Sequence, residues 1–365
     1  MVTPRYPPHL GGVESYAAWV ARTCRDAGHE VLVLTTAEGR HGSRDVQDGI
    51  DVVRLGSWFT VSNTPLSPLW WWQVRRVLRT FAPDVVNVHS PVPGLADLTA
   101  YAAGRTPVVM TYHSGSLVKG VGAPVDALLR AYERHVLPRV FRRCDRLVAV
   151  SPVSTAYATG RAEIVPPGVD VSLFTPGDPA ARDGDQVLFV GRLETTSRWK
   201  GVHVLIDAIA LLAARRPGVR LVLAGDGDDV PSLRAQVGAA GIEDRVTWLG
   251  SVPHHDLPPA YHRAAVTVLP SLTESESFGM SLVEAMACAC PVIGSDVGGI
   301  PFVVRDGVDG VLAAPGDVVA LAAAIESVLA DPVRASALGA AGRRAAEERW
   351  SWTRQEEHLL RVLTP

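Results

Sequence analysis

The stretch AVTVLPSLTESESFGMSLVEAMACACPVIGSD, residues 265–296, gives the plainest indication of the fold class. Ala265–Leu269 and Pro291–Gly294 are short, apolar and rich in β-branched residues, as buried strands are. Leu282–Ala289, between them, has the apolar spacing of a helix. A strand, a helix and a second strand in that order form a right-handed crossover between parallel strands. The stretch therefore predicts part of a parallel sheet covered by helices.

The same alternation continues on both sides of this stretch. The other expected strands are Glu30–Thr35, Asp84–Val88, Pro107–Thr111, Arg146–Val150, Val187–Val190, Arg220–Ala224 and Arg245–Leu249. The other expected helices are Glu14–Ala27, Leu66–Phe81, Val125–Arg143, Val202–Ala214, Val230–Ala239 and Val318–Ala330. A first strand has room only at Met1–Thr3, because Pro4 follows at once. We expect either a shortened strand there or a start assigned a few residues too late.

Two series of strands and helices predict an α/β fold with two doubly wound, Rossmann-like domains. The 365 residues exceed the roughly 100–150 of an ordinary domain. Phe174–Asp185 has the Pro, Gly and Asp content of a linker. We place the domains at residues 1–170 and 171–349. Ligands of open parallel sheets lie beyond the carboxyl ends of the strands, so we expect the two domains to face each other across a cleft that holds the site.

Composition excludes several classes of protein. The 35 basic and 38 acidic residues give a net charge of −3, so no nucleic-acid partner is expected. Cys24, Cys144, Cys288 and Cys290 lack the spacing of a metal site, and we interpret them as buried, reduced thiols. No apolar run reaches the roughly 18–20 residues of a membrane span, and from the prolines that follow Met1 we expect no signal sequence. We expect a cytoplasmic protein that can contact the inner face of a membrane.

Two stretches are suited to binding an anion. Gly11 and Gly12 precede a helix, where glycine allows a close backbone approach and the helix start offers N–H groups. A simple tight turn is the alternative. Arg192 follows a strand and can bind phosphate oxygens in a fork, and Lys200, one of two lysines, supplies a point charge before the next helix. Two solvated surface cations are the alternative reading, and the adjacent Arg198 is a possible substitute.

Two carboxylates follow the strand that ends at Leu269. Glu276 lies in the loop and Glu284 about two turns into the helix. Carboxylates accept two hydrogen bonds from vicinal hydroxyls, which suits one hexose and one ribose. The N–H groups of Phe278, Gly279 and Met280 are expected to point towards a diphosphate. A solvated acidic loop is the alternative.

Histidines occur at two notable places. His113 follows a strand of the first domain and can hydrogen-bond a sugar hydroxyl or a backbone group, although a lone histidine is more often structural. His254, His255 and Asp256 are adjacent, so their side chains diverge and no metal site is expected there.

Three tryptophans, Trp70, Trp71 and Trp72, stand next to Arg75 and Arg76. A helix with this composition can present an acceptor-binding or membrane-contacting face. Partly buried helix packing explains the same residues equally well.

Taken together, these stretches resemble the retaining glycosyltransferases of family four, which have the two-domain GT-B architecture. The similarity covers nearly the whole chain through the motifs PPHLGGVE, TYHS, VAVS, IVPPGVD, FVGRL, WKGV, LAGDG, EAMA and PVIGSDVGGIP. The resemblance implies an acceptor-binding first domain and a nucleotide-sugar-binding second domain. It also implies that the final helix, within residues 350–365, packs back on the first domain.

The resemblance further implies roles for single residues. Gly11 and Gly12 would approach the donor diphosphate, and Arg192 with Lys200 would hold its phosphates. Glu276 would bind the transferred hexose and Glu284 the ribose, while backbone groups of Phe278, Gly279 and Met280 lie near the donor. His113 would lie by the donor sugar. No Asp-x-Asp pair occurs in these phosphate stretches, so neither a metal nor another cofactor is expected.

Departures from the family pattern leave the donor open. Pro167 replaces an Asn, Cys290 stands where a Gly usually precedes Pro-Val-Ile, and Phe302 replaces an acidic residue. The acceptor is open as well, since the loops Gly56–Pro68 and Ser114–Pro124 would select it and encode no recognisable preference. A nucleotide-sugar epimerase, a phosphorylase and a non-catalytic nucleotide-sugar-binding partner are the competing hypotheses.

Overall fold

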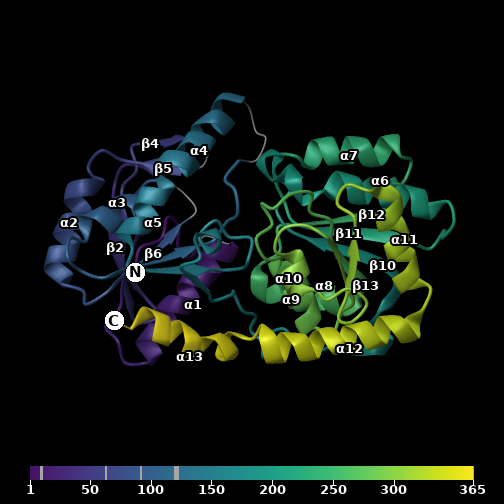
Figure 1. Ribbon diagram of the computed structural model, residues 1–365. Helices are drawn as coiled ribbons and strands as arrows, with labels where there is room; N and C mark the ends of the chain where they lie inside the picture. The colour runs from purple at the N-terminus through teal and green to yellow at the C-terminus, as the bar shows by residue number, and fades with distance from the viewer. Residues whose placement is uncertain (9–10, 62–63, 91–92, 119–122, 365) are drawn as a thin grey trace. The chain divides into compact units, whose positions relative to one another are not determined.

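The computed structural model divides the chain into two units, each with its own parallel sheet (Figure 1). The structure describes residues 1–8, 11–61, 64–90, 93–118 and 123–364. The first unit comprises Met1–Pro167 and Gln355–Pro365, and the second comprises Gly168–Arg354. The expected linker Phe174–Asp185 thus lies inside the second unit. Its Pro and Gly content marks an irregular segment, but Phe174 is fully buried and Asp183 already begins a strand.

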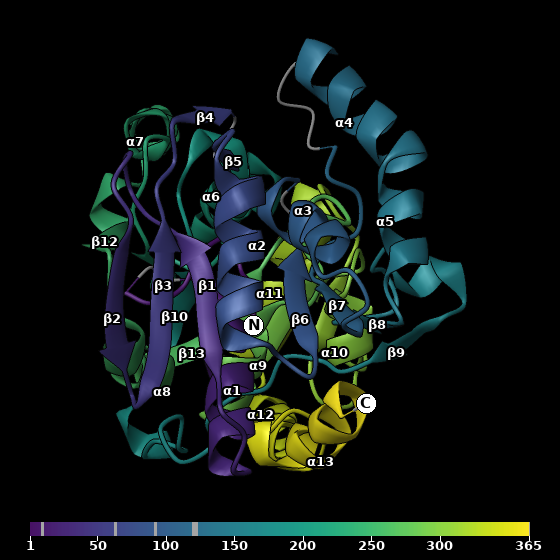
Figure 2. The ribbon, with the colours of Figure 1, turned by 90° about the vertical axis from the view of Figure 1, so that its left-hand side faces the viewer.

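The main sheet of the first unit has the order β2-β3-β1, then Val2, then β6-β7-β8-β9 (Figure 2). Val2 pairs with Leu34 and with Val88, both in parallel, and so joins the two halves of the sheet. In the given sequence, this one bridging residue stands where the first strand was expected. All other neighbours are parallel except β2 on β3. The strands of this unit are β1 (Leu32–Thr36), β2 (Ser43–Gln47), β3 (Ile50–Leu55), β4 (Phe59–Val61), β5 (Thr64–Leu66), β6 (Val86–Ser90), β7 (Val108–Tyr112), β8 (Arg146–Ala149) and β9 (Ala162–Ile164).

The helices of the first unit differ from the sequence prediction at several points. Leu95–Ala102 is a helix that was not predicted, and the helix expected over Leu66–Phe81 begins only at Trp70, because Leu66 belongs to a strand. Val125–Arg143, expected as one helix, forms two, because Pro138 lacks an N–H group and its ring clashes with the preceding turn. Pro138 sits in the first turn of the second helix, where proline is tolerated. The helices are α1 (Gly12–Asp26), α2 (Trp70–Phe81), α3 (Leu95–Ala102), α4 (Ala123–His135), α5 (Leu137–Arg143) and α13 (Trp352–Leu363).

The sheet of the second unit is entirely parallel and has the order β12-β11-β10-β13-β14-β15. Numbered within the unit, this is the strand order 3-2-1-4-5-6 of a Rossmann fold. Its strands are β10 (Asp183–Val190), β11 (Arg220–Ala224), β12 (Val246–Gly250), β13 (Ala264–Leu269), β14 (Val292–Ser295) and β15 (Val311–Ala313). Its helices are α6 (Val202–Ala213), α7 (Val230–Ala239), α8 (Pro258–Arg263), α9 (Met280–Ala287), α10 (Ile300–Val303), α11 (Val318–Leu329) and α12 (Pro332–Arg349).

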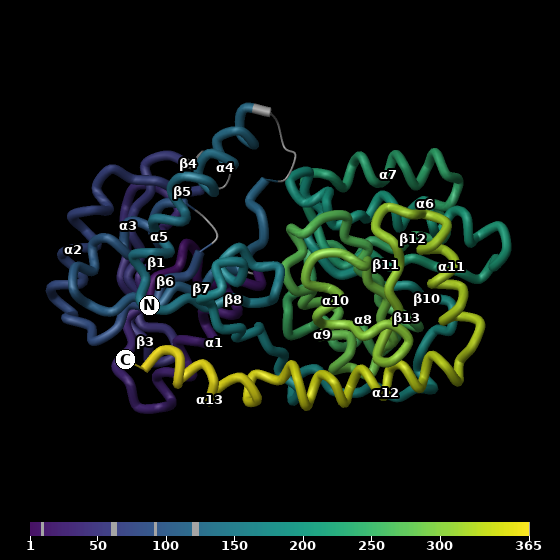
Figure 3. Tube along the Cα trace, viewed as in Figure 1, coloured from purple at the N-terminus to yellow at the C-terminus, as the bar shows by residue number. Residues whose placement is uncertain are grey.

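The C-terminal part of the chain returns to the first unit. Figure 3 shows the trace leaving α12 and entering α13, which ends close to β8 and β9. The guanidinium of Arg146 in β8 donates to the carbonyl oxygens of Arg361, Val362 and Thr364 at 2.9–3.0 Å. Through these bonds a side chain of the sheet binds the last turn of α13, whose carbonyl groups have no partner within the helix.

Within the described ranges, no helix combines the length and the apolar character that crossing a bilayer requires.

Candidate active site

The central strands of the second sheet mark the place where a ligand is expected. β10 and β13 are neighbours, and the chain leaves them in opposite directions, to β11 on one side and to β14 on the other. In open parallel sheets, ligands bind beyond the carboxyl ends of the strands at such a switch point. The segment after β10 carries Arg192 and Lys200, and the loop after β13 carries Glu276.

Lys200 and Glu276 form an ion pair at this edge. The Nζ atom of Lys200 donates to Oε2 of Glu276 at 2.8 Å, and the two side chains are only 15% and 10% exposed. The hydroxyl of Ser271 donates to the same carboxylate oxygen at 3.3 Å. The ammonium also lies 4.7 Å from the centre of the Trp199 ring, a favourable cation–π distance. The site therefore holds a cation suited to phosphate beside a carboxylate suited to hydroxyl groups.

Glycines at this edge allow the two loops to approach each other. Gly201 has a φ of +74°, and a Cβ atom there would overlap the carbonyl oxygen of Pro270. A Cβ atom on Gly299 would overlap the carbonyl oxygen of Ser277. The N–H group of Gly299 donates to the carbonyl oxygen of Glu276 at 2.8 Å. The backbone around Lys200 and Glu276 is thus fixed by contacts that only glycine permits.

Arg192 is placed differently from Lys200. Its side chain is 55% exposed and lies 3.7 Å from a carboxylate oxygen of Glu194. Among the described contacts, none joins Arg192 to Lys200 or Glu276. Arg198, the possible substitute, instead lies 3.6 Å from the buried carboxylate of Asp229. The structure therefore brings together Lys200 and Glu276, but it leaves Arg192 on the surface.

Glu284 lies in α9 with both carboxylate oxygens bonded to protein groups. Tyr261 donates its hydroxyl to Oε2 at 2.7 Å, and Nε2 of His254 lies 2.9 Å from Oε1. The bond to Glu284 raises the pKa of His254, while burial beside the carboxylate raises the pKa of Tyr261. The sequence analysis missed both partners, whose positions next to Glu284 depend on packing. The predicted bond from Glu284 to a ribose stays a prediction.

His254 makes a different contact from its neighbours His255 and Asp256. His254 turns to Glu284, whereas His255 lies 3.5 Å from the exposed Asp256. Across the described ranges, no three His, Cys, Asp or Glu side chains lie close enough together to hold a metal ion.

The segment Phe278, Gly279 and Met280 forms the start of α9. Gly279 has a φ of +94° and precedes the helix, which begins at Met280. The ring of Phe278 is buried and packs edge-on against Phe302 and Trp350, with ring centres 6.4 and 5.4 Å apart. Phe302, which departs from the family pattern, therefore completes an aromatic cluster. The ring of Phe278 is thus engaged in packing, and the donor contacts expected from the backbone of this segment stay a prediction.

His113 of the first unit lies in a buried histidine pair. Its Nε2 atom is 3.0 Å from Nδ1 of His89, the two rings are stacked, and the ring of Tyr16 packs edge-on against His113. Burial lowers the pKa of His113 to about 3, so the ring is neutral at neutral pH. His89 was missed by the sequence analysis, although it lies one residue before the end of β6 and His113 directly follows the adjacent β7. Its own pKa is lowered by burial and by His113.

The predicted anion site at Gly11 and Gly12 contains a carboxylate. Gly12 is the first residue of α1 and Gly11 caps it, as expected for a helix start. The carboxylate of Glu14 lies so close to Gly11 that a Cβ atom there would overlap it. Glu14 therefore occupies the positive end of the helix itself, and the approach of a diphosphate to Gly11 and Gly12 stays a prediction.

Comparison with known proteins assigns both units. The first matches the family model "Glycosyltransferase Family 4" over residues 10–173, and the second matches "Glycosyl transferases group 1" over residues 175–345. The chain is 31% identical to phosphatidyl-myo-inositol mannosyltransferase of Mycolicibacterium smegmatis, over 99% of this chain and 92% of that protein. From the same organism, a GDP-mannose-dependent alpha-(1-6)-phosphatidylinositol monomannoside mannosyltransferase is 28% identical, over 100% and 97% of the two chains.

A solved structure agrees with this assignment. Sucrose-phosphate synthase from Thermosynechococcus elongatus aligns with a TM-score of 0.78 at 25% identity, over 96% of this chain and 92% of that chain. The sequence relatives cover both units, and the structural match extends over both Rossmann-like sheets. The chain therefore belongs to the glycosyltransferases of family four, with the GT-B fold, and is an enzyme that transfers a sugar from a nucleotide sugar.

Proposed function

We propose that this enzyme transfers a hexose from a nucleotide-diphosphate sugar to an acceptor hydroxyl with retention of the anomeric configuration. The observation that carries the proposal is the ion pair of Lys200 and Glu276 at the switch point of the second sheet. A partly buried ammonium beside a buried carboxylate suits a ligand that has phosphates next to a polyhydroxylated ring.

In the proposal, Lys200 and Arg192 bind the diphosphate. Negative charge develops on the diphosphate as it leaves, and positioned cations stabilise the transition state more than the ground state. Lys200 has three N–H donors, of which Glu276 accepts one, so the ammonium can bind phosphate without losing its partner. The exposed side chain of Arg192 would turn from Glu194 to the phosphates. Glu276 would accept hydrogen bonds from the hexose, and Glu284 from the ribose.

The reaction balances without a nucleophile from the protein. The acceptor oxygen forms a bond to the anomeric carbon as the bond from that carbon to the diphosphate breaks. The departing phosphate takes the proton of the acceptor hydroxyl on the same face of the sugar, which accounts for retention. His113, neutral at neutral pH, would donate or accept a hydrogen bond at the transferred sugar and would not exchange a proton with it.

We infer that GDP-mannose is the first donor to test. One relative named above is a GDP-mannose-dependent mannosyltransferase, and the relative at 31% identity is also a mannosyltransferase. We further propose that no metal ion is needed, because Lys200 and Arg192 supply the positive charge. The acceptor contributes a free hydroxyl group.

The test measures thermal stabilisation by GDP, UDP and ADP and by their mannose and glucose conjugates. A donor present at 100 times its dissociation constant stabilises the protein by about 2.7 kcal/mol, which gives a clear shift of the melting temperature. Turnover is then followed as release of the nucleotide diphosphate, with and without a panel of lipid, inositol and saccharide acceptors, and with EDTA.

Four outcomes distinguish the proposal from its competitors. The proposal is supported if release of the nucleotide diphosphate requires an acceptor and persists in EDTA. The product formed from an α-linked donor should then be α-linked as well. Acceptor-independent release of the nucleotide favours an epimerase, and turnover that depends on inorganic phosphate favours a phosphorylase. Donor binding without turnover on the whole panel favours a non-catalytic binding partner.

A further inference from the structure

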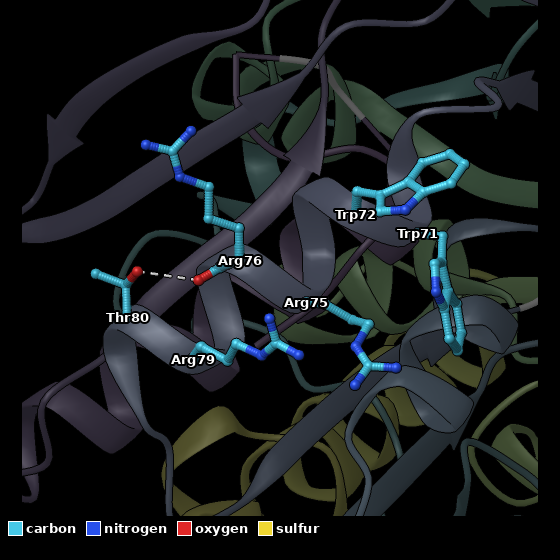
Figure 4. A pocket seen from close by; sticks show the side chains of 6 residues that line it. All are labelled: Trp71, Trp72, Arg75, Arg76, Arg79 and Thr80. Carbon is cyan, nitrogen blue, oxygen red and sulfur yellow. Dashed lines mark hydrogen bonds between the residues drawn. The ribbon is translucent and has the colours of Figure 1, made fainter.

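The outer face of α2 forms a hollow to which the proposed reaction assigns no role. The hollow has a volume of about 460 Å³ and is lined by Trp71, Trp72, Arg75, Arg76, Arg79 and Thr80 (Figure 4). These residues form two adjacent rows along the helix, because residues four apart lie on the same face. One row is Trp71, Arg75 and Arg79, and the other is Trp72, Arg76 and Thr80.

The opposite face of α2 anchors the helix to the first unit. Trp70 is 1% exposed and donates its indole N–H to the carbonyl oxygen of Gly56 at 3.0 Å, and Val74 is fully buried. Val77 and Leu78 continue this apolar side. Trp70 therefore packs α2 against the first unit, which agrees with the prediction of partly buried helix packing. The other two tryptophans are not needed for packing of this inner face.

The outer face is strongly cationic. α2 contains Arg75, Arg76 and Arg79 and no acidic residue, in a chain whose net charge is −3. Within the described ranges, none of these three exposed guanidinium groups has a carboxylate within ion-pair distance. The Arg75 guanidinium instead lies 5.4 Å from the centre of the Trp71 ring. A local charge of +3 without counter-charges is complementary to a surface of anionic phosphates.

Exposed apolar side chains surround the start of the same helix. Trp72 is 66% exposed and Leu69 is 41% exposed. Trp58 and Phe59, 47% and 53% exposed, belong to the segment that leads into the β4–β5 hairpin. The N–H group of Trp58 donates to the carbonyl oxygen of Leu66 at 2.9 Å, which holds that segment close to the chain that enters α2. Tryptophan beside arginine is the composition of helices that lie in a membrane interface.

We propose that the outer face of α2 docks the enzyme on a bilayer that contains anionic phospholipids. Arg75, Arg76 and Arg79 bind lipid phosphates, while Trp72 and Leu69 enter the headgroup region beside them. The hollow between the two rows of side chains accommodates a phosphate headgroup. The proposal concerns a surface apart from the Lys200–Glu276 pair, so its test does not depend on the transferase reaction.

The test is sedimentation with vesicles of phosphatidylcholine alone and of phosphatidylcholine with about one third phosphatidylglycerol. We expect the full chain to bind only the anionic vesicles, and less tightly in high salt. The triple variant Arg75→Gln, Arg76→Gln, Arg79→Gln should bind them on the order of 100-fold more weakly, since each basic residue near an anionic surface contributes about fivefold. Trp72→Ala should also weaken binding, by loss of its inserted ring.

A charge-matched control is the triple variant Arg263→Gln, Arg334→Gln, Arg344→Gln in the second unit. These arginines are exposed as well, so the variant has the same net charge and should bind anionic vesicles as the unmodified chain does. Circular dichroism and melting temperature should be unchanged in both triple variants. Equal losses in the two variants would show a non-specific charge effect and overturn the proposal. Stabilisation by inorganic phosphate without any vesicle binding would overturn it too, in favour of a soluble phosphorylated ligand.

Discussion

Lys200 and Glu276 give the sharpest prediction for a single side chain. We expect Lys200→Ala to lower kcat by about 10²–10³, because removing one positioned donor to a developing negative charge has an effect of that size. Glu276→Ala should lower turnover heavily as well, through lost contacts to the hexose. Both variants should remain folded, as circular dichroism would show.

Arg215→Ala is the matched control for Lys200→Ala. Arg215 pairs with Glu326 at 3.5 Å in the same unit, but both side chains are exposed, so its removal should leave kcat unchanged. Transfer at the normal rate by both Lys200→Ala and Glu276→Ala would contradict the assigned roles.

The buried His113 predicts that the first unit loses stability in mild acid. The folded pKa of about 3 lies below the unfolded value, so between pH 7 and pH 5 only the unfolded state gains a proton. The free energy of unfolding should fall by about 2 kcal/mol over this range from His113 alone. His89, whose pKa is also lowered, acts in the same direction.

Hydrogen exchange of Val108–Tyr112, corrected for the intrinsic effect of pH, measures this loss within one unit. In His113→Asn, protection of these amides should fall less between pH 7 and pH 5 than in the unmodified enzyme. His255→Asn, which changes an exposed histidine, should keep the normal dependence. Identical pH dependence in all three proteins would show that His113 titrates normally.

The end of α9 contains a backbone conformation that favours glycine. The N–H group of Cys290 donates to the carbonyl oxygen of Ala285 at 2.8 Å, and that of Ala289 to Met286 at 2.9 Å, which is the Schellman pattern. Ala289 has a φ of +54°. Sequence analysis placed the missing glycine at Cys290, but the structure places the left-handed residue one position earlier. Cys290 is itself buried beside Thr267.

We therefore expect Ala289→Gly to stabilise the second unit. A left-handed alanine costs about 1–2 kcal/mol, and the added freedom of glycine in the unfolded chain offsets about 0.4–1 kcal/mol of the relief. A rise of roughly 2 °C in the melting temperature of this unit is expected. Ala287→Gly, two residues earlier in regular helix, should destabilise it by about 1 kcal/mol. The same sign of change in both variants would refute the explanation.

Helices and strands with a clear spacing of apolar residues could be predicted from the sequence. Elements that form only by pairing with a neighbouring strand could not. The strands near β7 and β13 and the helices near α1 and α2 have clear apolar periodicity. β2 was missed because Ser43–Gln47 is exposed and mostly polar, and its hydrogen bonds come from pairing with β3. The division between α4 and α5 could have been predicted from Pro138, but the sequence analysis treated the two as one helix.

For the candidate site, the sequence supplied residue types and the structure supplied their partners. Lys200 and Glu276 were both predicted as site residues. Their direct pairing could not be predicted, because it joins residues 76 positions apart. His89 and Tyr261 carry no local signal, and His254 drew notice only for its neighbours His255 and Asp256. The side chain that each of the three contacts is set by tertiary packing. Arg192 was predicted to bind phosphate because it is an arginine that follows a strand. Neither observation indicates how exposed its side chain is.

The chain passes between its two units twice, and the second passage brings residues 355–364 into the first unit. Leu359, Val362 and Leu363 of this segment are buried. Burying three such side chains contributes about 1.5–3 kcal/mol each, close to the whole stability of a domain. Deletion of residues 355–365 should therefore unfold the first unit, while the second unit keeps its protection against hydrogen exchange.

A milder variant tests the same attachment without removing the segment. Arg146→Ala removes the three bonds to the end of α13 and should increase hydrogen exchange in β8 and β9. Arg361→Ala changes an exposed side chain of α13 but keeps its bonded carbonyl group, so exchange should stay normal. Unchanged exchange in Arg146→Ala would show that the three bonds do not hold α13 in place.

The discontinuous first unit has a consequence for synthesis on the ribosome. Domains generally fold as units while the chain emerges, the N-terminal one first. Here residues 168–354 can complete their unit earlier, because the unit that contains residue 1 still lacks its final helix. The part of the enzyme that is translated first is thus expected to be the part that finishes folding last.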